Sequence, residues 1–499
     1  MKKFLALVLI LAMVLCAMPT VFADDQPLEI SAMVTQFQQA PDENGDFWKW
    51  MESTFNVDYS CEWVPETSYS DKMALVLSTA DFPDILQVSS TTAASVVNAA
   101  NDGLFYDLTD LIDPEAYPNL AALNKSAWMN SKINGRNYFL PRTRGQYNNG
   151  LYLRQDILDE MGVSTPVTLS EYEAYFRYVK DNYPDMVPLA CQLVYLDMFF
   201  LAAFGDGAIK PVYTEDGEGI VYEELTESYA QFIGWIQKLY ADGILASEFA
   251  LYNAAKNQDL FLAGLTSARM QNIWHRWRLE TSLQQAVPEA SLVPAFYVTS
   301  DDGKNVAVQY DTGFYGGLAI NADCAPEKVE KMLAFFNQTA DPANYYTFRY
   351  GLEGVHWNMV DGYPVSTDKG KEEVTVSFYG PFCLATNLYD KVDSAAAPAA
   401  YNNESREMAK TIDTAAELVG AAPFRIFTLI NSSTWSTYWA VEKTNFDSFV
   451  ADTIMGNHTI DELRAYQAQI LATDEVQTAC KEFKESYDLF GLADWTPSN

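Results

Sequence analysis

The segment INGRNYFLPRTRGQYNNGLYLR, residues 133–154, decides how the rest of the chain is organised. Two β-rich runs, at 138–141 and 150–153, lie on either side of a polar connector that contains Gly145. This pattern predicts two strands joined by a bend rather than one strand or one helix. The segment is therefore either a hinge between two lobes that also contacts a ligand or an ordinary surface hairpin. The connector's possible hydrogen-bond donors are Arg142, Arg144, Gln146, Tyr147, Asn148 and Asn149.

The start of the chain has the pattern of an export signal. Lys2 and Lys3 precede an uncharged apolar run over 4–18, and Val21 and Ala23 stand where a signal peptidase reads small residues. The run is shorter than the roughly 20 residues that a membrane-spanning helix needs. We therefore expect cleavage after Ala23, so that residues 1–23 are a signal peptide and the protein is secreted or held at the cell surface.

The cysteines do not form a recognisable framework. Cys16 raises the possibility of lipid attachment, but Leu15 stands where a lipoprotein signal has a small residue, so simple secretion is favoured. The other cysteines are odd in number and widely scattered, which predicts no disulfide framework and no paired metal-thiolate site. We expect mostly buried thiols at Cys61, Cys191, Cys324, Cys383 and Cys480.

Length and charge limit the kind of protein. A chain of 499 residues with 49% hydrophobic content is long enough for two domains with their own cores. The formal net charge of −35 argues against DNA or RNA as a partner, since nucleic-acid-binding proteins present positive charge to the phosphates. Anionic membrane surfaces are disfavoured for the same reason.

The first part of the mature chain alternates between strand and helix patterns. This order predicts a mainly parallel sheet with helices on its faces, and in such sheets ligands bind beyond the carboxyl ends of the strands. The loops at 36–39 and 89–92 follow two of these strands, which makes Gln38 and Ser90 candidate ligand residues. The alternative for Ser90 is a helix cap. The predicted strands are 28–35, 57–64 and 83–89, and the predicted helices are 47–55 and 69–79.

A second candidate site follows the strand predicted over 266–273. Trp274, His275, Arg276 and Trp277 come directly after it. An indole face can pack on the apolar face of a sugar ring, while the cationic side chains can hydrogen-bond its hydroxyl groups. The alternative is that both tryptophans are core residues, since tryptophan is commonly largely buried.

Seven motifs in a fixed order span nearly the whole mature chain. Together they resemble the extracellular solute-binding proteins of carbohydrate ABC importers, of family 1, and in particular the longer, lipoprotein-like branch that binds oligosaccharides. The motifs are DFPDILQVSS at 81–90, LFYDLTDLID at 104–113, INGRNYFLPR at 133–142, LYLRQDILDEMGV at 151–163, FLAGLTSARM at 261–270, RYGLEGVHW at 349–357 and IMGNHTIDELRAY at 454–466.

The resemblance implies a type II periplasmic-binding-protein fold, in which two α/β lobes are joined by a hinge that the chain crosses several times. Lobe one would comprise 24–143 and about 305–380, and lobe two 144–304 and about 381–499. The first crossing would lie at INGRNYFLPR and the second near 293–296. Under this reading 138–141 and 150–153 are framework strands, whereas Arg142, Arg144 and Gln146 lie at the cleft.

The resemblance also implies a function and further site residues. The protein would capture an oligosaccharide by hinge closure and deliver it, as a monomer, to ABC permease subunits in the membrane. Trp274 matches the position of a stacking aromatic, with Trp277 behind it, and SSTWSTYWAV at 432–441 resembles a helix start that offers Trp435 or Trp439. The motif RYGLEGVHW is interpreted as a structural corner.

Two other functional classes share some of these features. A secreted carbohydrate-active enzyme needs two carboxylates, which 67 acidic residues can always provide, but no metalloprotease, nucleotide or nucleophile motif is present. We therefore expect no enzyme, no cofactor and no metal. A calcium loop at Asp42, Asn44 and Asp46 is not predicted, because Phe47 stands where the loop needs glycine. A sensory sugar-binding protein that feeds a membrane receptor would have the same fold.

The charge of the sugar stays open at the level of sequence. The acidic net charge disfavours polyanionic ligands at long range. The guanidinium groups of Arg142, Arg144 and Arg276 can nevertheless bind a uronate carboxylate bidentately. Charges more than a screening length of roughly 8 Å away are largely screened, so the local geometry outweighs the net charge. Both neutral and acidic oligosaccharides are therefore candidates.

Overall fold

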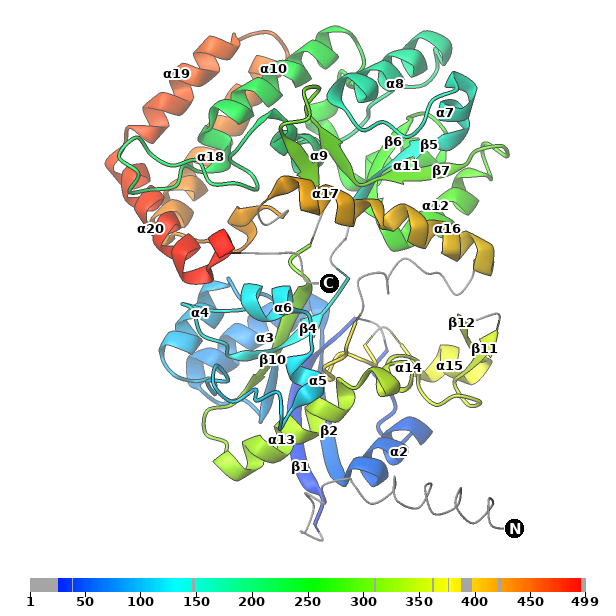
Figure 1. Cartoon of the computed structure of the whole chain (residues 1–499), viewed down its shortest axis with the longest axis vertical. Coiled ribbons are helices and arrows are strands. Elements are labelled where there is room, and N and C mark those ends of the chain that lie inside the picture. The colour runs from blue at the N-terminus through cyan, green and yellow to red at the C-terminus, as the bar shows by residue number, and fades with distance from the viewer. Residues whose placement is uncertain are drawn as a thin grey trace, which may run out of the picture.

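The computed structural model describes residues 26–37, 39–145, 149–308, 311–360, 363–375, 377–386, 397–420 and 424–494. The predicted signal peptide, Cys16, Gln38 and Gln146 lie outside this part of the chain, as does the side chain of Trp274. Over the described ranges, no helix combines the length and the apolar character that crossing a membrane requires. The chain forms two lobes, one above the other in Figure 1.

Lobe one is built on a five-stranded sheet of order β2-β1-β3-β10-β4. Strand β1 runs parallel to β2 and β3, and β10 runs antiparallel to both β3 and β4. The predicted parallel pairing is confirmed for β1, β2 and β3, whereas β10 makes the sheet as a whole mixed. The strands are β1 (Leu28–Gln36), β2 (Val57–Pro65), β3 (Ile85–Val88), β4 (Phe139–Thr143) and β10 (Phe314–Ile320).

Helices cover both faces of this sheet, as its alternating side chains require. Ile30, Ala32 and Val34 point to the face covered by α2 (Asp46–Phe55) and α13 (Pro326–Thr339), where they join one apolar core. Met33 points to the opposite face and joins a second core with α3 (Glu66–Thr79) and α4 (Ala94–Asn101). The other elements of lobe one are α5 (Pro118–Ala121), α6 (Lys125–Asn130), η5 (Pro342–Asn344), α14 (Tyr345–Tyr350), β11 (Trp357–Val360), β12 (Tyr363–Ser366) and α15 (Asp368–Glu373).

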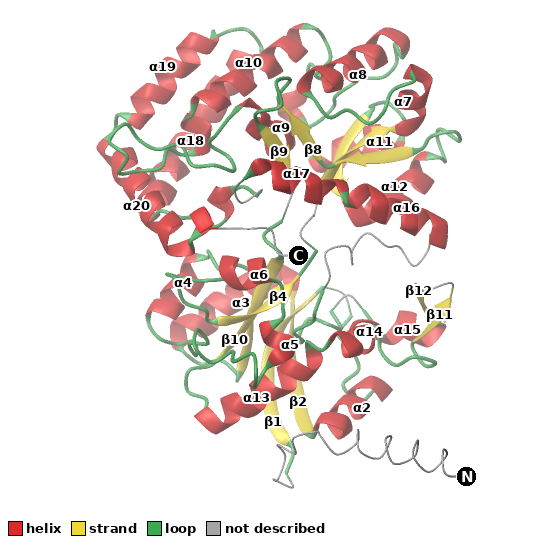
Figure 2. Ribbon diagram, in the orientation of Figure 1, coloured by secondary structure: helices red, strands yellow, loops and turns green. Residues whose placement is uncertain are grey.

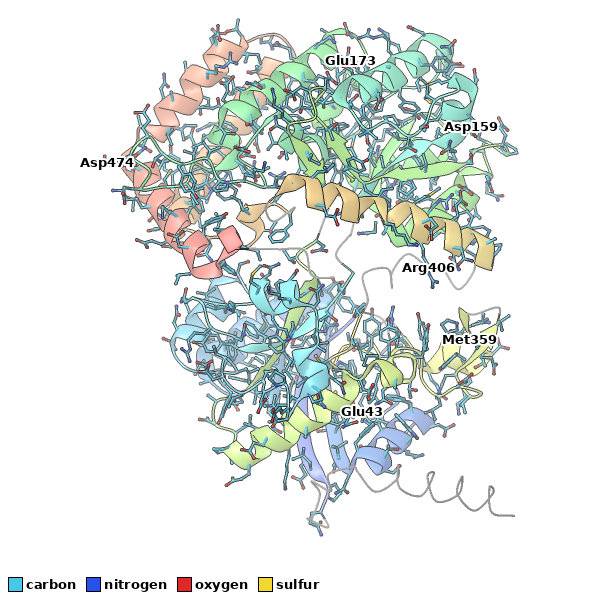
Figure 3. All side chains as sticks on the ribbon, viewed as in Figure 1. Glu43, Asp159, Glu173, Met359, Arg406 and Asp474 are labelled. Atoms are coloured by element: carbon cyan, nitrogen blue, oxygen red, sulfur yellow. The ribbon has the colours of Figure 1, made fainter. Side chains whose placement is uncertain are left out.

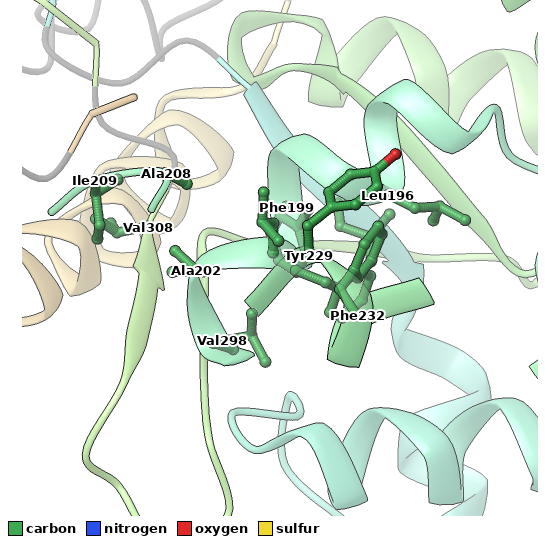
Figure 4. Close-up of a cluster of buried hydrophobic side chains, with 14 of the residues drawn as sticks. Leu196, Phe199, Ala202, Ala208, Ile209, Tyr229, Phe232, Val298 and Val308 are labelled. Atoms are coloured by element: carbon green, nitrogen blue, oxygen red, sulfur yellow. The ribbon is translucent and has the colours of Figure 1, made fainter. Parts of the chain in front are cut away.

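Lobe two contains a smaller sheet of order β6-β5-β7, in which β5 is antiparallel to both neighbours. The strands are β5 (Asn149–Arg154), β6 (Ala268–Asn272) and β7 (Leu292–Ala295), and a separate hairpin joins β8 (Tyr297–Thr299) to β9 (Val306–Val308). Figure 4 shows Val308 of this hairpin beside Ile209, and both residues belong with Val298 and Phe232 to the core of lobe two.

Helices make up most of lobe two, and Figure 2 shows that they surround its short strands. The segments at 397–420 and 424–494 pack on this lobe, as expected for the helical remainder after Cys383. The helices are α7 (Gln155–Met161), α8 (Leu169–Asn182), α9 (Leu193–Phe200), η1 (Leu201–Phe204), η2 (Glu223–Leu225), α10 (Glu227–Ala241), η3 (Phe249–Leu251), α11 (Ala254–Leu262), η4 (Ile273–His275), α12 (Arg276–Leu283), α16 (Ala399–Ala409), α17 (Thr411–Val419), η6 (Ile426–Thr428), α18 (Ser433–Ile454), α19 (Ile460–Leu471), α20 (Asp474–Phe490) and η7 (Leu492–Asp494).

The segment at 133–154 passes from one lobe to the other. Its first strand, β4, pairs with β10 in lobe one, and its second strand, β5, pairs with β6 and β7 in lobe two. The two strands therefore belong to different sheets, and the alternative of a surface hairpin is wrong. The chain returns to lobe one between Val308 and Phe314. The expected second crossing near 293–296 is wrong, because residues 293–295 pair with β5 in the lobe-two sheet and the later strand β9 also belongs to the core of lobe two.

The motif RYGLEGVHW forms a structural corner in lobe one, as interpreted from the sequence. The Leu352 amide donates to His356 Nδ1 at 2.9 Å, and the other ring nitrogen lies 3.0 Å from a Glu373 carboxylate oxygen. The indole of Trp357 donates to the Gly351 carbonyl at 2.7 Å. Figure 3 places Met359, which follows this corner on β11, at the outer edge of lobe one.

Candidate ligand-binding cleft

A cleft of about 320 Å³ opens between the two lobes, beside the chain crossings. Lobe one contributes the loop after β3 and the start of β10, and lobe two contributes the start of β5, the end of β9 and the turn before α18. Its lining residues are Ser89, Ser90, Thr91, Thr92, Asn149, Met198, Val308, Asp311, Thr312, Phe314, Tyr315, Gly316, Phe424, Arg425, Thr428 and Leu429.

Tyr315 is an aromatic side chain that the cleft leaves exposed. Tyr315 keeps 37% of its surface accessible, although it lies on β10 in the five-stranded sheet of lobe one. The pairing of β10 with β4 shifts register between Phe314 and Gly317, and Gly316 inside this bulge has φ of +65°. Bulges commonly re-aim a side chain beside a functional site. The bulge therefore presents the Tyr315 ring to the cleft, where it can stack on an apolar ligand face.

Arg425 lies at the opposite wall of the cleft and is held by two buried carboxylates. Its guanidinium donates to the Asp197 carboxylate at 3.0 and 3.4 Å and forms an ion pair with Glu223. The Arg425 side chain is 20% exposed, whereas the two acidic side chains are 9% and 5% exposed. Two carboxylates with few other partners fix the guanidinium bidentately, so this arginine is a rigid hydrogen-bond donor at the cleft.

Glu224, the next residue, is buried with an unusual protonation equilibrium. Burial is the largest of the causes that raise the pKa of Glu224 to about 8. The neighbouring carboxylates of Asp197, Glu223 and Asp447 act in the same direction, and Lys443, 3.7 Å away, opposes them. Burial likewise raises the pKa of Glu223 to about 7 against the effect of Arg425. The folded protein therefore holds these protons more tightly than the unfolded chain does.

The pH dependence of stability follows from this sign. Because both pKa values are raised in the folded state, the stability from these groups is fully present below pH 4.5 and is lost as the pH rises to about 8. Glu224→Gln should flatten that fall between pH 5 and 8 by at least about 1.4 kcal/mol, the free energy of one pKa unit. Denaturant unfolding over this range measures it. The control is Glu475→Gln, at an exposed position. If the free energy of unfolding falls equally with pH in the wild-type protein and in both variants, the prediction is contradicted.

The structure places Ser90 at the cleft, as the position of its loop after a strand predicts. Its hydroxyl lies 3.1 Å from the Thr92 hydroxyl and accepts from the Thr92 amide at 3.3 Å. The N-cap of α4 is Ala93, which makes no side-chain cap. The alternative that Ser90 caps this helix is therefore wrong.

Arg142 and Arg144 lie beside the same cleft. The Arg144 guanidinium packs over the Tyr315 ring at 4.3 Å, and that of Arg142 lies 6.0 Å from the same ring. Both arginines also line a small recess of about 30 Å³ in lobe one. Neither arginine is among the residues that line the cleft, and their contacts with Tyr315 place them next to it. Their predicted role at the cleft stays a prediction.

The backbone of Trp274 lies close to the cleft. It follows the last residue of β6, Asn272, by two positions, and Asn272 pairs with the cleft residue Asn149. The side-chain amide of Asn272 donates from Nδ2 to the Asn149 side-chain oxygen at 2.9 Å. The side chain of Trp274 lies outside the described residues, so its predicted stacking role stays a prediction.

The residues that follow Trp274 have other partners. Arg276 is 5% exposed, donates to the Leu292 carbonyl at 3.0 Å and to the Ser405 hydroxyl at 2.9 Å, and packs over Tyr401 at 4.1 Å. Trp277 packs edge-on against the same Tyr401 ring. These two side chains join α12 to α16 and do not line the cleft. Their predicted role as ligand residues is therefore not supported by this placement.

His275 and Trp435 are also set back from the cleft lining. Burial lowers the pKa of His275 to about 4, with Arg278 and Arg269 lowering it further, so its ring is neutral near pH 7. Trp435 is 5% exposed and packs on Tyr222 and Trp439 at ring distances of 4.3 and 4.5 Å. The tryptophan at the start of α18 is thus a core residue, because an aromatic cluster of lobe two encloses it.

Tyr315, Asp311 and Arg425 are cleft residues that the sequence analysis missed. The pair of glycines after Phe314 and Tyr315 was a usable signal, since glycine inside a strand often marks a bulge. No local signal existed for Arg425, whose partner Asp197 is 228 positions away. No group of three or more histidine, cysteine, aspartate or glutamate side chains in the described ranges is arranged to hold a metal ion.

Comparisons with known proteins bear on this architecture. No family model matches the chain. An HMO-binding, ABC-transporter-associated solute-binding protein from Bifidobacterium longum infantis superimposes on 94% of this chain and 99% of its own, with a TM-score of 0.69 at 15% identity. This chain has a solute-binding-protein fold. The type of fold expected from the sequence is confirmed.

Two curated relatives share this similarity at the level of sequence. The polygalacturonan/rhamnogalacturonan-binding protein YtcQ of Bacillus subtilis is 26% identical over 67% of this chain and 68% of its own length. The lipoprotein LipO of the same organism is 22% identical over 68% of this chain and 70% of its own. The resemblance to the extracellular solute-binding proteins, first drawn from seven motifs, is confirmed by these relatives.

Proposed function

We propose that this protein is the extracytoplasmic solute-binding component of a carbohydrate ABC importer and captures an oligosaccharide in the cleft between its lobes. The observation that carries the proposal is the cleft itself, in which an exposed aromatic ring faces hydrogen-bonding side chains from both lobes. An aromatic face with a few convergent polar groups suits a sugar ring. Its relatives support the choice, since the name of one specifies a polygalacturonan or rhamnogalacturonan and that of a solved structure specifies HMO.

Binding would act through closure of the lobes. The chain passes from β4 in lobe one to β5 in lobe two and returns from β9 to β10, so a change in a few backbone angles between these strands would move one sheet relative to the other. Side chains of the second lobe would contact the ligand only in the closed state, and that difference in affinity would shift the equilibrium. We further propose that the exported protein acts as a monomer, is secreted or surface-held, and passes the ligand to membrane permease subunits.

The function is tested with purified protein and a panel of neutral and acidic oligosaccharides. A ligand at 100 times its Kd stabilises the folded state by about 2.7 kcal/mol, which a thermal-shift assay detects. Titration calorimetry then gives the Kd, and chromatography follows the sugar. We expect binding without cleavage. Release of shorter sugars, abolished by one carboxylate substitution, would indicate the alternative of a carbohydrate-active enzyme, and uptake that does not depend on the protein would indicate a sensor.

Tyr315→Ala should weaken binding of the identified oligosaccharide by about 10- to 100-fold, because the exposed ring supplies the apolar contact in the cleft. Tyr315→Phe should retain most of the affinity, since it keeps the ring. The control is Tyr213→Ala, which removes a surface tyrosine that is 49% exposed in lobe two. A Tyr315→Ala protein with unchanged affinity in calorimetry would remove this ring from the site.

A further inference from the structure

Arg142 is a buried arginine whose charge has no counter-ion. It lies on β4, is 7% exposed, and its Nη1 atom has no hydrogen-bond partner in the structure. Among the described residues, no carboxylate forms an ion pair with Arg142 or with Arg144. A buried charge without a partner is costly, so proteins retain one where something else supplies the partner.

The surroundings of the two arginines are aromatic and cationic. Burial, followed by the nearby Arg144, lowers the pKa of Arg142 to about 10, and the other groups that influence it are the phenols of Tyr379, Tyr315 and Tyr69. The recess of about 30 Å³ that both arginines line also includes Arg349, which packs over the Tyr379 ring at 3.8 Å. This is an electropositive recess in a chain whose formal net charge is −35.

One carboxyl group of the cleft acts on Arg144. Asp311 lines the cleft and has its pKa raised by burial, while Arg144 acts on it in the opposite direction. Its carboxylate accepts from the Thr312 amide at 2.7 Å and from the Thr312 hydroxyl at 3.2 Å. Asp311 is not among the groups that shift the pKa of Arg142, so it does not supply the missing counter-ion of that buried arginine.

Tyr315 connects the cleft to the two arginines of the recess. This ring lines the cleft, and the same ring carries Arg144 at 4.3 Å and Arg142 at 6.0 Å. The recess, at about 30 Å³, has less than a tenth of the cleft's volume of about 320 Å³, so it holds a few atoms and not a sugar ring. The recess is therefore sized for one small substituent of a sugar whose ring lies in the cleft.

We propose that Arg142 and Arg144 form a subsite for the carboxylate of a uronic acid residue, with the ring of that sugar on Tyr315. This inference rests on the proposed function. A guanidinium pairs bidentately with a carboxylate, and such charge-assisted bonds are about twice as strong as neutral ones. The acidic surface does not oppose this pairing, because surface charges are screened beyond roughly 8 Å. Arg276 does not belong to the subsite, since Leu292, Ser405 and Tyr401 occupy it.

The test uses matched sugars. Trisaccharides that contain glucuronate, galacturonate or mannuronate are compared by calorimetry with the same trisaccharides after reduction of the carboxyl group to an alcohol. At least one uronate should bind 10-fold or more tightly than its reduced counterpart. Arg144→Gln should weaken that uronate by about 10- to 100-fold and change the affinity for the reduced sugar less than 3-fold. Arg144→Lys keeps the charge but not the bidentate geometry. Its affinity for the uronate should therefore lie between those of the wild-type protein and the Arg144→Gln variant.

Two further variants keep the result interpretable. Arg464→Gln removes the same charge from an exposed ion pair with Glu227 in lobe two, and it should leave both affinities unchanged. Arg142→Gln should act like Arg144→Gln, and because Arg144 is only half-buried its variant is informative even if loss of Arg142 impairs folding.

The outcomes separate the subsite from the function. If uronate and reduced sugars bind equally, or if Arg144→Gln weakens both to the same extent, the subsite is overturned while the proposed function stands. A sulfated trisaccharide without uronic acid serves as a different anion. If it binds more tightly than every uronate, the assignment to a carboxylate is overturned. If no sugar of any panel stabilises the protein, the proposed function fails and the subsite with it.

Discussion

Replacing Arg425 by methionine should lower the free energy of unfolding by about 3 to 5 kcal/mol at pH 7, because it leaves the Asp197 carboxylate buried without a counter-charge. The Glu223 carboxyl, whose pKa is already raised to about 7 beside Arg425, should take up a proton instead. The loss should shrink as the pH falls, since protonation of the two carboxylates removes the unpaired charges. Denaturant unfolding, followed by tryptophan fluorescence at pH 5 and pH 7, measures both effects. A loss below about 1 kcal/mol would show that solvent already compensates these carboxylates.

Two further variants identify the cause of that loss. Arg464→Met removes an arginine from an exposed pair, 41% and 55% exposed, and should cost no more than about 1 kcal/mol. Adding Asp197→Asn and Glu223→Gln to the Arg425→Met protein should restore part of the stability, because the buried charges are then gone. The triple variant should nevertheless bind the sugar more weakly than the wild-type protein, because it lacks Arg425, which lines the cleft.

Gly316→Ala should lower the free energy of unfolding by about 3 kcal/mol or more and should also weaken ligand binding. The glycine has φ of +65°, and a Cβ atom there would lie 1.8 Å from the Val88 carbonyl oxygen. Either β10 must move away from β3 or the bulge must be lost, and both changes displace the Tyr315 ring from the cleft.

The matched control for this substitution is Gly103→Ala in the same lobe. Gly103 also has positive φ, +76°, but a Cβ atom at this position would meet nothing within 4 Å. Gly103→Ala should therefore lower the free energy of unfolding only by the backbone strain, about 1 kcal/mol. If Gly316→Ala unfolds as Gly103→Ala does and binds sugar normally, the bulge does not position Tyr315.

Much of lobe one could be predicted from the sequence because its signals are local. The alternation of Ile30, Ala32 and Val34 with Met33 sends neighbouring side chains to two different cores, and the predicted strand 28–35 became β1 at Leu28–Gln36. The same reasoning located the loop after β3, so that Ser90 was predicted near the ligand and lies at the cleft. Periodicity and strand order suffice for both.

The site residues of lobe two could not be predicted in the same way. Arg276 and Trp435 have the residue types of a sugar site, but Ser405 and Tyr222 occupy them, and these partners lie more than 100 positions away in the chain. A sequence pattern shows that an aromatic or cationic side chain follows a strand. It does not show whether a distant helix will cover that side chain.

The sequence by itself determined that residues 133–154 contain two strands with a polar connector, since strand propensity and turn chemistry are properties of neighbouring residues. Only the tertiary structure decided that these strands belong to different sheets, because pairing depends on β10 and β6, which are more than 100 residues away. The same long-range packing left Arg142 buried beside Tyr315 without a carboxylate partner in the described residues. Composition could not reveal this, since it records how many charges a chain carries but not which of them meet.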